Sequence, residues 1–132
     1  MFLNRLDNDE KNLFVSLAAI AANTNGVVTS EEHHMIEEYC REMNIASFDL
    51  ARTTKYEEII TCYSNSNEQH KKIVILELIG LMYADGEYDE EEKRFVSDFS
   101  SRIGIDGSYV EMIETALIKY LEVTRDLLAY IE

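Results

Sequence analysis

Apolar residues recur along this chain at the spacing of an α-helix. In the segment from Leu13 to Ala21 they fall three or four positions apart, which places them on one side of a helix. The same spacing returns in residues 35–43, 95–103 and 113–131. No segment alternates apolar and polar residues over a useful length, as a half-buried strand would. The pattern therefore predicts an all-α protein.

We call such a one-sided row of apolar residues a stripe. Two segments depart from this pattern. Residues 73–82 are apolar apart from Glu77 and Gly80, and a helix that is apolar on nearly all sides is one surrounded by other helices. We therefore expect this segment to be the central helix. Residues 47–64 are less regular, with β-branched threonines in their middle, and predict a short helix followed by a second one from about Lys55.

Polar residues mark where these helices begin and end. A Ser, Thr or Asp followed three residues later by Glu or Gln can cap a helix start, because each side chain accepts a hydrogen bond from a backbone N–H that the helix leaves free. Asn44 and Gly104 follow two of the stripes and are expected to end them, since both tolerate the left-handed conformation of a helix C-terminus. The predicted starts are Asp7/Glu10, Thr29/Glu32, Thr54/Glu57, Ser66/Gln69, Asp89/Glu92 and Ser108/Glu111.

The chain also contains an internal repeat. An offset of 60 residues brings Gly26 onto Gly86 and aligns the apolar positions of residues 35–45 with those of residues 95–105. Each unit is an apolar helix, a tight Asn-Gly or Asp-Gly turn and a capped amphipathic helix. Two copies are too few for a solenoid, which needs three or more repeats.

The repeat predicts the domain organisation. We expect one domain over residues 1–132, a compact helical bundle of two pseudo-symmetric helix-turn-helix repeats. The first repeat covers about residues 7–64 and the second about residues 67–132.

Composition and charge narrow the classes of partner. The chain has no proline, against an average usage of about 5%, which favours helices. It carries 26 acidic and 12 basic residues, a formal net charge of −14. Nucleic acids and anionic membranes bind basic surfaces, so we expect neither as a partner, whereas a divalent cation or a basic protein fits this charge.

The sequence predicts a cytoplasmic location. The N-terminus lacks the basic segment and long apolar run of a signal peptide. The longest apolar stretch, residues 73–84, is shorter than the roughly 20 residues needed to span a bilayer. Cys40 and Cys62 have no metal-site spacing and are expected to be buried, reduced thiols.

The densest group of carboxylates follows the second Gly turn. Residues 85–92 contain six acidic side chains. The helix dipole favours carboxylates at a helix start, which accounts for those inside the helix but leaves the two that precede it unexplained. The cluster is therefore a candidate site for a divalent cation or a cationic partner. The candidate metal ligands are Asp85, Glu87, Asp89 and Glu92.

This turn is not an EF-hand. Such a loop needs oxygen ligands at its first and third positions and a glycine at its sixth. With Gly86 at the sixth position, Leu81 and Tyr83 fall at the first and third, so both of these ligands are missing.

The stretch from Leu78 to Glu92 resembles the TerB-like tellurite-resistance family. The mark of that family is an apolar helix ending in Ala-Asp-Gly-Glu, followed by a capped helix with an acidic start, and both parts occur here. The resemblance implies a bacterial all-helical domain of two repeats, associated with metal or envelope stress. The family's acidic positions correspond to the four candidate ligands. Asn25 and Val27 replace the Asp and Glu in the first repeat, which argues against a symmetric pair of cation sites.

Other candidates for chemistry are weaker. His33 and His34 each stand four residues before a glutamate, a spacing that can hold zinc, but no third ligand is evident. His70 is expected at the surface. The sequence shows no nucleophile elbow and no glycine-rich phosphate loop, so we expect a protein that is not an enzyme, with a small hydrolase as a remote alternative.

The C-terminal stripe is the best argument for a partner. Leu127, Leu128, Tyr130 and Ile131 continue the apolar pattern to the last residues. This surface can pack on its own bundle, which we expect, or on a second copy. The oligomeric state that the sequence predicts is a monomer or a homodimer. The function that the sequence favours is an interaction module that presents an acidic surface to a basic protein partner. The alternative is a divalent-cation-binding protein.

Overall fold

The computed structural model describes residues 2–22, 30–43, 54–83 and 88–132. No strand occurs within these ranges, which confirms the prediction of an all-α protein. The second helix expected after residue 47 is present, while the first falls outside the described residues. The elements are η1 (Leu3–Arg5, a 3₁₀ turn), α1 (Asn8–Ala22), α2 (Ser30–Glu42), α3 (Tyr56–Ser64), α4 (Glu68–Met82), α5 (Glu90–Arg102) and α6 (Gly107–Ile131).

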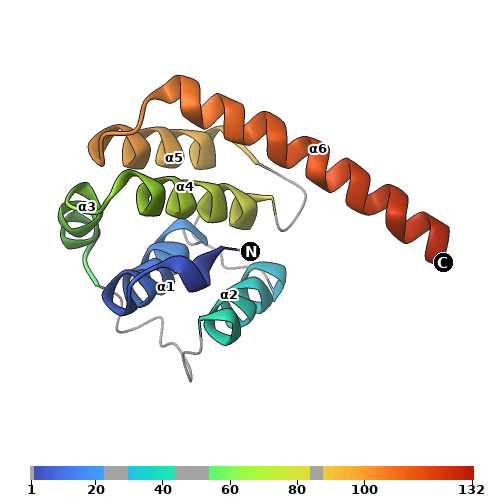
Figure 1. Cartoon of the computed structure of the whole chain (residues 1–132), viewed down its shortest axis with the longest axis horizontal. Helices are drawn as coiled ribbons and strands as arrows, with labels where there is room; N and C mark the ends of the chain where they lie inside the picture. Colours follow the sequence, from blue (N-terminus) through green and yellow to red (C-terminus); the bar gives the residue numbers. More distant parts are fainter. Residues whose placement is uncertain (1, 23–29, 44–53, 84–87) are drawn as a thin grey trace.

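Helix α4 is the centre of the bundle, as its all-round apolar sequence predicts. It packs against η1, α1, α3, α5 and α6. In Figure 1, α5 and α6 lie on one side of α4, α1 and α2 lie on the other, and α3 lies across one end. Val74, Ile75, Leu78 and Ile79 are completely buried in consequence.

Aromatic contacts join the outer helices to this core. The ring of Phe14 in α1 meets that of Tyr39 in α2 edge-on, with centroids 5.2 Å apart. Tyr63 in α3 and Phe99 in α5 make a second edge-on pair at 6.0 Å. Such pairs add about 0.5–1.5 kcal/mol to the stabilisation that comes from burying their surface. One aromatic pair therefore joins α1 to α2, and the other joins α3 to α5.

Two of the predicted helix starts have the expected capping contacts. At α1, Glu10 Oε1 accepts a hydrogen bond from Asp7 N at 2.9 Å. At α5, Asp89 and Glu92 form the full reciprocal capping box. Gly104 ends α5 with a φ of 88°, a conformation that glycine adopts without a Cβ clash. The start at Thr29 and the stop at Asn44 lie outside the described residues.

Three other starts are displaced from the predicted residue. Asn67 rather than Ser66 caps α4, and Asp106 rather than Ser108 caps α6. Each prediction was wrong because a neighbouring Asn or Asp, at least as good a cap as serine, stands closer to the helix start. The start at Thr54 was wrong too, because α3 begins after Lys55 without a side-chain cap.

The helix bounds agree with the 60-residue offset of the sequence. Helices α1 and α4 both have 15 residues and start 60 positions apart. Helices α2 and α5 both have 13 residues and are displaced by the same amount.

Candidate functional site

Helix α6 carries most of the exposed large apolar side chains in the described part of the chain. Its start is fixed by Asp106, whose side chain accepts a hydrogen bond from Ser108 N at 3.0 Å. The first half of the helix packs on α4 and α5 and buries Val110 and Leu117. The second half extends past the bundle to the C-terminus (Figure 1). The bundle thus holds one half of the helix and leaves the other half open.

Exposed apolar side chains gather on α6, most of them on its open half. Nine large apolar side chains are exposed among the described residues, and eight of them belong to α6. Ile118 lies on the far side of the helix, while the other seven share one broad side at a helical spacing of 100° per residue. We call this side the α6 face. It consists of Met112, Tyr120, Val123, Leu127, Leu128, Tyr130 and Ile131.

The structure corrects the expectation that the C-terminal stripe packs on its own bundle. Tyr130 is 87% exposed and Ile131 is 80% exposed, and Leu127 and Leu128 are also open to solvent. The physical reason is length, because α6 has 25 residues and the helices beneath it have 13 and 15. The last turns of α6 therefore have no helix of the described bundle under them.

The acidic start of α5 serves as a helix cap. Asp89 Oδ1 accepts a hydrogen bond from Glu92 N at 2.8 Å, and Glu92 Oε1 accepts one from Asp89 N at 3.2 Å. Glu92 is only 5% exposed, while the neighbouring Glu90 and Glu91 are exposed. The structure thus brings two of the four candidate cation ligands together, in mutual hydrogen bonds.

The other two candidate ligands, Asp85 and Glu87, lie outside the described residues. The placement of the four-carboxylate set as one site therefore stays a prediction. The turn of the first repeat, at Asn25 and Gly26, lies outside the described residues as well.

A buried acid–base pair is the polar feature that the sequence analysis missed. His70 was expected at the surface, but it is 9% exposed, because its Nδ1 lies 2.7 Å from Glu10 Oε1 across the interface of α4 and α1. Ser66 Oγ donates a hydrogen bond to Glu10 Oε2. Burial raises the pKa of Glu10, but the hydrogen bonds from Ser66, Asp7 N and His70 outweigh it, so that the net pKa is lowered.

The same pair belongs to a cluster that could hold a metal ion, the one found among the described residues. Its members are Asp7, Glu10 and His70, and their ligand atoms all lie within 4.8 Å of one another. Both Glu10 oxygens already accept hydrogen bonds, so the cluster as it stands is a structural link. A signal for the pair was present, because the 60-residue offset places Glu10 on His70.

Each histidine of α2 lies close to a glutamate one turn further along the same helix. His33 Nδ1 lies 3.4 Å from Glu37 Oε1, and His34 Nε2 lies 3.8 Å from Glu38 Oε1. All four side chains are at least 45% exposed. These pairs are typical of a solvated helix surface.

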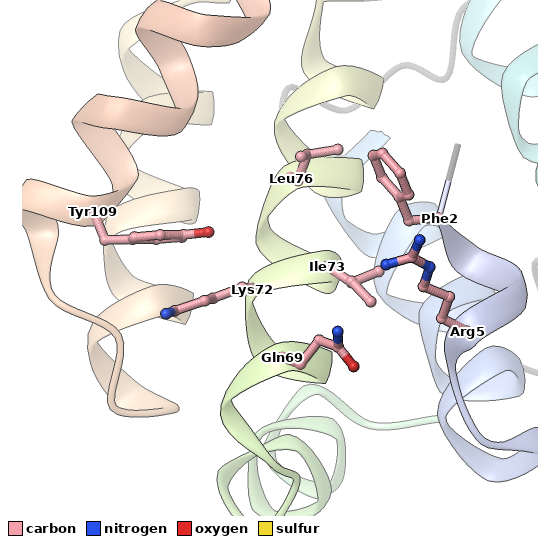
Figure 2. Close-up of a pocket in the computed structure, with 7 residues that line it drawn as sticks. All are labelled: Phe2, Arg5, Gln69, Lys72, Ile73, Leu76 and Tyr109. Carbon is pink, nitrogen blue, oxygen red and sulfur yellow. The ribbon is translucent and has the colours of Figure 1, made fainter.

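An open groove of about 390 Å³ lies over α4, between η1 and the start of α6 (Figure 2). On one side Lys72 Nζ lies 4.9 Å from the centre of the Tyr109 ring. On the other, Arg5 Cζ lies 5.3 Å from the centre of the Phe2 ring. Ile73 and Leu76 form the apolar floor, and Gln69 completes the lining. Phe2 is the ninth exposed apolar residue.

No family model, curated protein or solved structure matches this chain. The TerB-like assignment therefore stays a prediction from the Leu78–Glu92 motif. None of the helices in the described ranges combines the length and apolar character that crossing a membrane requires.

Proposed function

We propose that this protein is a non-enzymatic interaction module that binds another protein chain through the α6 face. The observation that carries the proposal is the concentration of exposed apolar side chains on α6. Soluble monomers rarely leave a contiguous apolar patch of more than a few hundred Å² in water, and larger ones mark interfaces. Aromatic and aliphatic residues together, as Tyr120, Val123, Leu127 and Tyr130 are, are typical of the centre of an interface.

The distribution of net charge along the chain supports a second binding surface on the same module, an acidic one. Residues 115–132 hold two basic and three acidic residues, a net charge of −1 within a chain of −14. Most of the excess negative charge therefore belongs to the bundle, including the exposed Glu90 and Glu91 at the start of α5. This distribution favours a basic protein partner for the acidic surface.

The proposal includes a two-repeat TerB-like fold and a role in a bacterial metal or envelope stress response. The equal lengths of α1 and α4, and of α2 and α5, support the two repeats. The contact of Glu10 with His70, 60 residues apart, supports a pseudo-two-fold axis between them. The stress response is suggested by the motif from Leu78 to Glu92.

Divalent-cation binding at the start of α5 is the second candidate function. The pairing of Asp89 and Glu92 in one helical turn favours it, because carboxylate oxygens are the ligands that hard cations prefer. What favours the interaction module is that both carboxylates already accept backbone hydrogen bonds. A cation would have to share these carboxylates with the helix cap.

Site-specific photocrosslinking in the native cell tests the proposed function. A benzophenone amino acid at Val123, on the α6 face, should give a covalent adduct with a protein, identified by mass spectrometry. The same probe at Ile118, exposed on the opposite side of the helix, is the matched control and should give little adduct. Equal or absent adducts at both positions would contradict the proposal.

A further inference from the structure

We propose that the occupant of the α6 face is a second copy of this chain, with the two α6 helices paired antiparallel. This inference rests on the proposed function, because it names the partner of the same surface. The two-fold axis passes between Tyr120 and Val123, at the middle of the exposed part of α6.

Four residues of the α6 face form a coiled-coil seam together with Ile113 and Ala116, which precede them on the helix. Along it, residues that face the same way are alternately three and four positions apart, the repeat of 3.5 that makes two helices wrap around each other. Four of the six seam residues are between 50% and 87% exposed, Ala116 is exposed and Ile113 is half-buried. In heptad notation the a positions are Ile113, Tyr120 and Leu127, and the d positions are Ala116, Val123 and Tyr130.

This seam is accessible in the folded bundle. Val110 and Leu117, which pack into the core, point roughly a quarter turn away from it around the helix. The distal half of α6 stands clear of the other helices (Figure 1). Because the bundle already holds the first half of α6, the helix is formed before the copies meet, and association does not have to nucleate it.

The sizes of the seam residues select the antiparallel orientation. In that orientation an a residue of one copy faces a d residue of the other. Leu127 then faces Ala116, and Tyr120 faces Val123, so that in these two pairs a large side chain meets a smaller one. A parallel pair would place Ala116 against Ala116 and leave a void between them.

Charge selects the same orientation. Lys119 and Asp126 flank the seam on one side of the helix. In the antiparallel pair Lys119 of each copy lies beside Asp126 of the other, which gives two opposite-charge contacts. In the parallel pair the neighbours of these residues would be Thr124 and Ile131, and neither contact forms. The low net charge of residues 115–132 also keeps repulsion between two acidic chains small where they touch.

Sedimentation equilibrium of the full chain tests the pairing. We expect a reversible dimer of twice the 15.3 kDa chain mass. Leu127→Glu should weaken it about 100-fold or more, because the symmetric dimer loses the apolar contact of Leu127 with Ala116 twice and buries two charges. Ile118→Glu, on the opposite side of α6, should leave the dimerisation constant within about 3-fold. A wild-type chain that remains at 15.3 kDa up to about 1 mM would overturn the proposal.

Crosslinking tests the orientation. Two variants are made in a Cys62→Ser background, one with Ala116→Cys and one with Leu127→Cys. A short bismaleimide is added to each variant alone and to a mixture of the two. Only the mixture should give a crosslinked dimer, because 11 residues, or about 16 Å along the helix, separate each new cysteine from its own counterpart in the antiparallel pair. Crosslinking of each chain with itself would show a parallel pair and refute the inference.

The two proposals fail in different ways. If the chain is monomeric in solution and the Val123 probe captures a different protein, the interaction module stands and the second copy is wrong. If the probe captures nothing and the chain is monomeric, both are wrong. An adduct of twice the chain mass supports both.

Discussion

Glu10 and His70 show how one buried pair can join two helices whose residues are 60 positions apart. Glu10 is 4% exposed and collects hydrogen bonds from Ser66 Oγ and Asp7 N in addition to the histidine. Tyr63 Oη donates a further hydrogen bond to the Glu10 carbonyl at 2.6 Å. This one residue therefore connects α1 to α3 and α4.

The carboxylate of Glu10 should make the protein less stable in acid. Its folded-state pKa lies below the ordinary 4.5, so it stabilises the fold above pH 4.5, and this contribution is lost as the pH falls through the lowered pKa. We expect Glu10→Gln to reduce the free energy of unfolding at pH 7 by about 2 kcal/mol. The deficit should shrink below pH 4.5, as measured by urea unfolding across the pH range.

Glu58→Gln is the matched control for this measurement. Glu58 is an exposed residue of α3, and we expect its replacement to change stability by less than about 0.5 kcal/mol at any pH. A Glu10→Gln deficit that stays constant from pH 7 to acid would show that the ionised carboxylate is not the source of the stabilisation.

The acidic start of α5 gives a second prediction at the scale of residues. Because Asp89 and Glu92 cap the helix, we expect millimolar Ca²⁺, Mg²⁺ or Mn²⁺ to leave the melting temperature unchanged. A site occupied at 100 times its Kd would instead stabilise the fold by about 2.7 kcal/mol. A rise in melting temperature that disappears in Asp85→Asn with Glu92→Gln would establish the cation site. Glutamine at position 92 preserves the capping contact, so this double variant still folds.

At the scale of elements, the apolar spacing predicted α1, α2, α4, α5 and α6 well, because a helical stripe records which side of a helix is buried. The exact caps were harder to predict. Ser66 and Asn67 both stand at the start of α4, and only the folded backbone shows that Asn67 is the one aligned with His70 N. The burial of His70 was missed because it depends on a partner 60 residues away, which a local pattern does not reveal.

The C-terminal stripe shows a second limit of the sequence. Its spacing showed an apolar side of α6, and this prediction is confirmed. It could not show what covers that side, because coverage depends on how far α4 and α5 extend beneath α6. A helix segment that packs on the bundle and one that extends past it can have the same apolar spacing in the sequence.

The end of α5 allows a prediction about one backbone position. Gly104 has a φ of 88°, and a Cβ there would meet only Lys71 Nζ at 3.7 Å, so the cost of a side chain is conformational and not steric crowding. We expect Gly104→Ala to lower the free energy of unfolding by about 1–2 kcal/mol in urea titrations. Gly107→Ala is the control, because a Cβ at Gly107 meets nothing within 4 Å and alanine favours a helix. Equal effects of the two variants would contradict the role of the left-handed conformation.

At the scale of the whole molecule, the distribution of charge separates two surfaces. The α6 segment from residue 115 to residue 132 is nearly neutral and apolar, while the bundle carries most of the −14 charge. Association through the first surface works against overall repulsion between like chains. Association of a basic protein with the second surface is helped by the same charge.

Salt should therefore act on these two associations in opposite directions. Raising NaCl from about 0.02 M to 0.5 M shortens the range of electrostatic forces from more than 20 Å to about 4 Å. We expect the dissociation constant of the homodimer to fall several-fold, because repulsion between two acidic bundles is screened while the apolar contacts of the seam do not depend on screening. The binding of a basic partner should weaken over the same range.

Sedimentation equilibrium at each salt concentration measures the effect on the homodimer. The control is Leu127→Glu, which lacks the apolar contact and should gain little dimer from added salt. A homodimer that dissociates as salt rises would mean that the contacts between Lys119 and Asp126, and not the apolar seam, hold the two copies together.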